Sequence, residues 1–165
     1  MCIRDRALSE RGRPPAQMIQ AMCLRPELLR AFAGFGDCVY PGGLLERSVK
    51  ELVILSASRR NDCQFCLSSH VDLTRMLGIA EDPLRALEDT GARTPRERLA
   101  IEYTHAAMTD ANRIPEDLYA RLHVAFSDPE LVELTFLVGF IQMLNLFNNA
   151  LGVRYESDYA ALARR

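Results

Sequence analysis

The stretch between residues 46 and 60 restricts the fold of this chain more than any other part of the sequence. Drawn as an α-helix, it is apolar nearly all round its middle, through Val49, Leu52, Val53, Ile54 and Leu55. Such a helix is stable only when other elements cover all of its sides. The rest of the chain has helical spacing and lacks the alternation of apolar and polar residues that is typical of strands. We therefore predict an all-α, single-domain helical bundle of about six to eight helices.

Capping residues, prolines and glycines predict where the helices begin and end. Thr94 and Glu97 have the spacing of a capping box, and residues 41–43 (Pro-Gly-Gly) stop an earlier helix. Residues 61–62 (Asn-Asp) form a break with N-cap chemistry, after which a new helix starts at about Cys63. The predicted helices cover residues 26–40, 46–60, 63–77, 83–89, 94–110, 115–126 and 129–151. We expect a leader over residues 1–14, one helical domain over residues 15–155 and a tail over residues 156–165.

Composition and charge argue against several classes of partner. The formal net charge is −2 and the pI is about 5.9, so no basic field attracts nucleic acid. The most apolar stretch, residues 131–147, is interrupted by Glu133, Gln142 and Asn145 and is short for a bilayer, which needs about 20 apolar residues. Charged residues also interrupt the N-terminal stretch, so it does not resemble a secretion signal. We predict a cytoplasmic protein with no membrane or nucleic-acid partner.

The chain has five cysteines, and an odd number without a secretion signal argues against a disulfide-stapled extracellular domain. Cys23 and Cys38 have no paired spacing, and we expect them to be buried, inert thiols. Cys63 and Cys66 differ, because a gap of two residues lets neighbouring thiols close into a disulfide and reopen with little backbone movement. Their predicted place in the first turn of a helix, near free backbone N–H groups, also favours a thiolate.

His70 and Glu51 are the side chains that we expect beside this pair. Cys63, Cys66 and His70 are spaced i, i+3 and i+7, so they share one stripe of a helix that continues inward through Leu73 and Leu77. Histidine titrates near neutral pH and is a suitable base one turn beyond Cys66.

Glu51 enters by a geometric argument. The helices over residues 46–60 and 63–77 are joined by two residues, so we expect them to fold back as an antiparallel pair. Counted from the turn, Glu51 and His70 then stand at similar heights, within roughly 3 Å. A carboxylate inside an apolar helix needs a partner, and His70 can supply it. Glu51 would hold the imidazole in one tautomer, as the acid does in other nucleophile–base–acid sets.

The cysteine pair alone fits three interpretations: a redox dithiol, part of a metal site, or an incidental spacing. A closed structural zinc site lacks ligands, because the sequence has no second pair of cysteines or histidines at ligand spacing. An open site made of two thiolates, one imidazole and one carboxylate stays possible. The joint spacing of all four residues favours the redox dithiol.

These residues carry a family resemblance. The pattern of Glu51, Cys63 twelve residues on, Cys66 and His70 resembles the active-site signature of the alkyl hydroperoxidase D-like branch of the carboxymuconolactone decarboxylase superfamily. Residues 94–100 and 145–153 are also similar to stretches of this family, and the likeness covers roughly residues 15 to 155. The best-characterised members carry a histidine just before the second cysteine, where this chain has Phe65.

The resemblance implies an all-helical fold and a thiol-dependent antioxidant enzyme. The dithiol would reduce hydroperoxides, or pass electrons to the disulfide of a peroxiredoxin, with no bound cofactor and with an external dithiol such as lipoamide as reductant. Cys66 would be the attacking thiolate and Cys63 the resolving thiol. His70 would be the proton relay, and Glu51 would orient or charge it.

Three other functions stay open. A non-catalytic redox sensor or assembly module would oxidise the same dithiol once, without turnover. A metal-assisted lyase or hydrolase would need a stoichiometric bound metal. Lactone decarboxylation is a weaker alternative, because the decarboxylase branch of the superfamily typically lacks the cysteine pair.

We also expect a homo-oligomer, and the resemblance implies dimers, trimers or hexamers. The predicted last helix is apolar on one side and carries several phenylalanines besides, which is more apolar surface than one core of this size covers easily. The residues on that side are Leu131, Leu134, Val138, Ile141 and Leu144.

Overall fold

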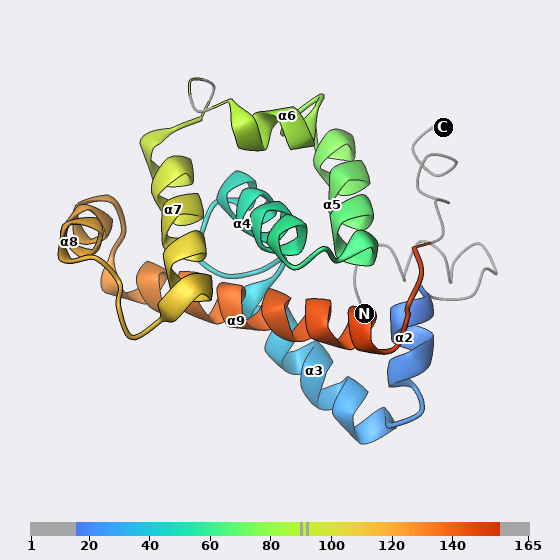
Figure 1. The fold of residues 1–165 in the computed structure, drawn as a ribbon. Helices are drawn as coiled ribbons and strands as arrows, with labels where there is room; N and C mark the ends of the chain where they lie inside the picture. Colours follow the sequence, from blue (N-terminus) through green and yellow to red (C-terminus); the bar gives the residue numbers. More distant parts are fainter. Residues whose placement is uncertain (1–15, 90, 92, 156–165) are drawn as a thin grey trace.

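The computed structural model describes residues 16–89, 91 and 93–155, and all regular structure within them is helical (Figure 1). Eight helices are described: α2 (Gln17–Met22), α3 (Pro26–Val39), α4 (Arg47–Arg60), α5 (Gln64–Met76), α6 (Pro83–Glu88), α7 (Pro95–Asp110), α8 (Glu116–Ala125) and α9 (Asp128–Ala150). The all-α prediction is confirmed, and every predicted helix begins and ends within one residue of its expected bounds. Helix α2 was not predicted. The expected leader and tail lie outside the described residues.

Helix α4 lies in the middle of the molecule. In Figure 1 it is surrounded by α5, α6, α7 and α9, and it packs on all four. Every residue from Val49 to Ser58 is buried, as the apolar sequence of this helix predicts. Because its middle is covered all round, the charged side chains of Lys50 and Glu51 are enclosed with it and need partners inside the protein.

Lys50 finds its partners in the segment that joins α3 to α4. Its ammonium group donates to the carbonyl of Val39 at 3.0 Å and to the carbonyl of Gly42. The carboxylate of Glu133, on α9, lies 2.6 Å from the same ammonium. Glu133 also accepts the backbone N–H groups of residues 44 and 45, at 2.5 and 3.2 Å. This cluster fixes the segment that leads from α3 into α4.

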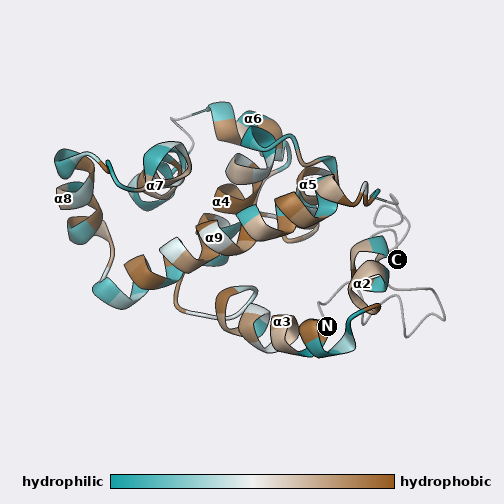
Figure 2. Ribbon diagram, turned by 60° about the horizontal axis from the view of Figure 1, so that its bottom comes forward, coloured by the Kyte–Doolittle hydropathy of each residue, from teal (hydrophilic) through white to brown (hydrophobic). Residues whose placement is uncertain are grey.

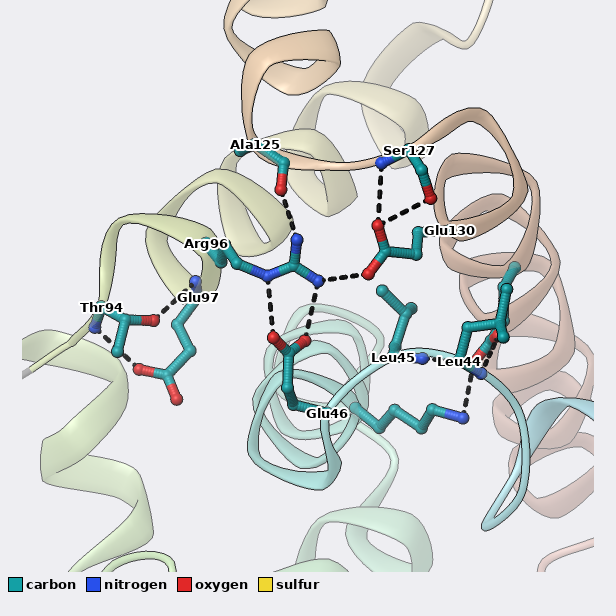
Figure 3. A network of polar contacts seen from close by, with 11 residues as sticks. Leu44, Leu45, Glu46, Thr94, Arg96, Glu97, Ala125, Ser127 and Glu130 are labelled. Carbon is teal, nitrogen blue, oxygen red and sulfur yellow. Dashed lines mark hydrogen bonds and ion pairs between the residues drawn. The ribbon is translucent and has the colours of Figure 1, made fainter.

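A second cluster of polar contacts holds the start of α4 against α7, α8 and α9 (Figure 3). The guanidinium of Arg96, in the first turn of α7, lies 2.9 Å from Glu46 and 2.6 Å from Glu130. It also donates to the carbonyl of Ala125, at the end of α8. Arg96 and the groups of Ser127 lower the pKa of Glu130 to about 2. One cation therefore ties α4, α7, α8 and α9 together, which keeps the entry to the central helix in place.

Helix α9 crosses the bundle and contacts α3, α4, α5, α7 and α8. By length and composition it is the one described helix that could cross a membrane. One face of it, however, forms the protein core, through Leu134, Leu137, Val138, Ile141 and Leu144. It is the core helix of a helical domain, and the expectation of a buried helix holds for this face only.

Candidate active site

The cysteine pair lies where α4 turns into α5. Asp62 adopts a positive φ of 48°, and the backbone N–H of Cys63 returns to the carbonyl of Ser58 at 2.9 Å. Cys63 itself is the extended residue before α5, so the predicted N-cap at residues 61–62 is wrong by one or two positions. Cys66 follows in the first turn. Both thiols are free and buried, with exposed fractions of 0% for Cys63 and 3% for Cys66.

The two thiols share a proton. A hydrogen bond with the Cys66 thiol, helped by the Cys66 backbone N–H and the amides of Asn145 and Asn148, outweighs burial and lowers the pKa of Cys63 to about 6. The same hydrogen bond, burial and the charge on Cys63 raise the pKa of Cys66. The reduced pair therefore carries one proton at neutral pH, and its negative charge rests on Cys63.

Glu51 and His70 meet as the sequence predicts. The carboxylate oxygen Oε2 of Glu51 lies 2.7 Å from Nδ1 of His70. Burial disfavours the charged carboxylate, but the charge and hydrogen bond of His70, with smaller contributions from Tyr40 and Arg47, hold the pKa of Glu51 below its ordinary value. An ionised carboxylate only accepts hydrogen bonds, so Nδ1 of His70 is the donor in this contact.

Tyr40 and Arg47 complete the set, and sequence reasoning missed both. The hydroxyl of Tyr40 donates to Oε1 of Glu51 at 2.6 Å, and Nε of Arg47 donates to the same oxygen at 2.7 Å. Arg47 also donates to the Tyr40 hydroxyl at 2.5 Å and stacks over its ring. The Tyr40 ring packs edge-on against His70. Arg47 stands four residues before Glu51 on α4, and that helical pair spacing was the signal available in the sequence.

A cavity of about 460 Å³ opens beside the dithiol. Its walls come from α2, α3, α4, α5 and α9, and most of them are apolar, with Phe32, Phe65 and Phe140 among the aromatic residues. Cys66 and His70 line it from α5. An apolar cavity that carries a thiol and a base is suited to a small organic substrate.

Comparison with known proteins identifies the family. The sequence profile of the carboxymuconolactone decarboxylase family matches residues 26–106, which contain Glu51, Cys63, Cys66 and His70. Structures of two AhpD-type proteins have the same fold. The chain belongs to the carboxymuconolactone decarboxylase / AhpD superfamily. The matched family is named after an enzyme, a decarboxylase, and one of the similar structures is described as a peroxidase-related protein.

Three similar proteins give the range of similarity. YdfG of Bacillus subtilis strain 168, an uncharacterized protein, is 27% identical over 117 residues, which are 68% of this chain and 80% of YdfG. An AhpD-type protein of unknown function from Agrobacterium tumefaciens is 26% identical, with a TM-score of 0.72 over 82% of this chain and 95% of that one. A peroxidase-related protein from Ralstonia eutropha JMP134 shares the fold at 18% identity, with a TM-score of 0.81 over 97% and 86% of the two chains.

Some sequence expectations about this superfamily member are wrong. Cys23 and Cys38 are exposed and not buried, because they lie at the end of α2 and on the outer part of α3. Leu77, expected to face inward with Cys66 and His70, is 47% exposed, because it caps the end of α5 where the helix leaves the bundle. In the described part of the chain, no group of three or more His, Cys, Asp or Glu side chains is placed to hold a metal ion.

Proposed function

We propose that this protein is a thiol-dependent peroxidase that reduces organic hydroperoxides with Cys63 and Cys66. One observation carries the proposal: a buried dithiol has one sulfur, that of Cys66, on an apolar cavity that also holds a histidine braced by a carboxylate. Membership of a superfamily that includes AhpD-type proteins supports it.

The proposed reaction has two steps at the dithiol. The thiolate of Cys66 attacks the outer oxygen of a hydroperoxide ROOH, the O–O bond breaks, and Cys66 becomes a sulfenic acid while the alkoxide leaves. A proton that Nε2 of His70 takes up from solvent converts the alkoxide to ROH. Cys63, which now holds the proton taken from Cys66, then attacks the sulfenic sulfur, and this proton leaves with the sulfenic hydroxyl as water while the disulfide forms. An external dithiol returns two electrons and two protons to the pair.

The division of labour follows from access and from the shared proton. Cys66 lines the cavity, whereas Cys63 has no exposed surface. The resting charge is on Cys63, so Cys66 must first pass its proton to the Cys63 thiolate, with which it is hydrogen-bonded. Proton transfer between hydrogen-bonded sulfurs needs no movement of the chain. We therefore assign attack to Cys66 and resolution to Cys63.

The apolar cavity favours organic hydroperoxides over hydrogen peroxide, because burying an alkyl or aryl group adds binding energy of roughly 25 cal/mol per Å². A dithiol of the lipoamide type is the proposed reductant, and a peroxiredoxin disulfide is the alternative electron acceptor. No bound cofactor takes part in this chemistry. A cytoplasmic location is part of the proposal, since a dithiol cycle needs a reducing compartment.

A steady-state assay with tert-butyl hydroperoxide and dihydrolipoamide tests the proposal. The wild-type protein should turn over many times, and Cys66→Ser should abolish peroxide consumption. Cys63→Ser should consume about one equivalent and stop as a sulfenic acid or mixed disulfide. Cys38→Ser, at an exposed thiol, is the matched control and should keep full activity. Turnover that survives Cys66→Ser would contradict the assignment.

A redox sensor is the second candidate, and the burial of the dithiol favours it. With exposed fractions of 0% and 3%, the disulfide is hard for a protein reductant to reach, and a sensor needs only one oxidation. The same assay separates the two functions, because a sensor consumes one equivalent of hydroperoxide per chain whatever the concentration of dihydrolipoamide.

A further inference from the structure

Helix α9 places an amide against the dithiol. Nδ2 of Asn148 donates to Sγ of Cys66 at 3.2 Å, and Asn148 is 1% exposed. The Cys66 thiol is 3% exposed, so both groups of this contact are buried. A neutral thiol is a weak acceptor, whereas a thiolate is a strong one, so the bond is worth most when Cys66 carries the negative charge.

The orientation of the Asn148 amide points to the same purpose. Its Nδ2 also approaches Sδ of Met18, at 3.5 Å, so its donors face two sulfurs. Its Oδ1 is buried and accepts no hydrogen bond from the described residues. Leaving a buried carbonyl oxygen unpaired is unfavourable, and the loss is offset when the N–H groups of the same amide meet a charged acceptor.

Asn145, one turn earlier on α9, fixes the position from which Asn148 acts. Its Nδ2 donates to the hydroxyl of Ser58 at 3.2 Å, and its Oδ1 accepts from Asn61 at 3.0 Å. Ser58 and Asn61 stand in the last turn of α4 and the residue after it, directly before Cys63. This part of α9 is thus locked to the turn that carries the dithiol. Asn145 and Asn148 both act to lower the pKa of each of the two thiols.

We propose that Asn148 is a catalytic residue, which donates a hydrogen bond to the reacting sulfur of Cys66 and stabilises its thiolate, and that Asn145 positions it. The inference rests on the proposed function for the identity of the reaction but concerns the charge of the dithiol itself. As the shared proton moves from Cys66 to Cys63, the negative charge moves toward the Asn148 amide. The amide needs no reorientation, so the thiolate forms where its donor already stands.

Thiolate titration tests this inference without any peroxide. Ultraviolet absorbance of the thiolate against pH, together with the rate of iodoacetamide alkylation of residues 63 and 66, is measured for wild type, Asn148→Ala and Asn148→Asp. The wild-type midpoint is expected at about 6. Asn148→Ala should raise it by about one pKa unit, and Asn148→Asp by more, because an isosteric acceptor with negative charge replaces the donor. Alkylation at pH 6 should slow about fivefold in Asn148→Ala, because the thiolate fraction at that pH falls from about one half to about one tenth.

Gln142→Ala is the matched control, since it removes an exposed amide from the same helix and should leave the midpoint unchanged. Circular dichroism checks that each variant folds. If Asn148→Ala does not fold, Asn148→Ser, which keeps a small donor, is measured in its place. A midpoint that is the same in wild type and in the folded Asn148 variants overturns the inference. Peroxide turnover bears on the proposed function alone, so a wild-type protein without turnover but with a shifted Asn148→Ala titration would defeat that function and leave this inference standing.

Discussion

Glu51 carries a negative charge inside the protein, and three hydrogen-bond donors to its two carboxylate oxygens stabilise this charge. His70 binds one carboxylate oxygen, while Tyr40 and Arg47 bind the other. The pKa of Glu51 lies below its ordinary value of 4.5. Its ionised form therefore stabilises the folded state at pH values above about 4.5, and this contribution is lost as the pH falls through the lower folded-state pKa.

Tyr40→Phe should lower the melting temperature in a pH-dependent way. The change removes one donor, so the pKa of Glu51 rises toward its ordinary value and the folded state loses part of that contribution. A hydrogen bond to a charged group is worth about 1.5–3 kcal/mol. The deficit relative to wild type should be largest near neutral pH and should shrink as the pH falls through the lowered pKa of Glu51, where the carboxylate becomes protonated. Tyr119→Phe, at a half-exposed tyrosine, is the control. A deficit that is constant from acid to neutral pH would mean that the hydroxyl does not act through Glu51.

At this scale the sequence predicts some contacts and not others for a physical reason. Glu51 and His70 could be paired because both stand on helices joined by a two-residue turn, which fixes their heights. Tyr40 could not be placed, because it follows α3 and reaches Glu51 only through the course of the segment before α4. Asn148 was part of a recognised family stretch, but a contact across 82 residues of sequence has no local signal.

Among the elements, the segment between α3 and α4 decides whether Tyr40 and Arg47 reach the site. It has no regular structure of its own, and Lys50 and Glu133 hold it from the inside. Lys50 is fully buried, so its charge depends on this partner. Lysine is rarely buried, and only the tertiary packing explains why Lys50 lies inside the protein. The core pattern of α4 was predictable, but the partners of Lys50 were not.

Glu133→Gln should destabilise the protein by about 3–5 kcal/mol, because it leaves the ammonium group of Lys50 buried and uncompensated. Chemical denaturation measures the loss. Glu88→Gln is the control, since the Arg59–Glu88 pair is more than half exposed on the glutamate and should contribute about 0–1 kcal/mol. Equal effects of the two substitutions would contradict the role of Glu133 as the partner of the buried Lys50. Hydroperoxide turnover of Glu133→Gln should also fall, because Tyr40 then loses its fixed approach to Glu51.

For the whole molecule, the outer face of α9 remains apolar after the chain has folded. We expected one side of α9 to be more apolar than a single core can cover. That side is mostly buried, at Leu134, Val138 and Ile141. A second stripe of apolar residues lies on the outer face of α9, and its members are four, seven and three residues apart. Figure 2 shows apolar segments recurring along this helix. The residues of the stripe are Val132, Phe136, Met143 and Leu146, with exposed fractions of 56%, 53%, 46% and 70%. Gly139, within this stripe, leaves open space for a close approach.

We propose that this stripe joins copies of the chain into a homo-oligomer, because an exposed apolar strip of this length usually marks an interface. Light scattering at micromolar concentration should give a mass above that of one chain. Leu146→Glu should shift the protein toward the monomer, whereas Val124→Glu, at an apolar residue of α8 that is 90% exposed, should not. A wild-type protein that is monomeric at that concentration would rule out the assembly.

Disulfide mapping after oxidation tests whether Cys63 and Cys66 form the redox site. The reduced protein is treated with one equivalent of tert-butyl hydroperoxide, its free thiols are alkylated, and its peptides are analysed by mass spectrometry. Cys63 and Cys66 should be joined in an intramolecular disulfide, while the exposed Cys23 and Cys38 stay fully alkylated. If Cys63 and Cys66 are both alkylated after this treatment and Cys23 or Cys38 is oxidised instead, the redox site is not the Cys63–Cys66 pair.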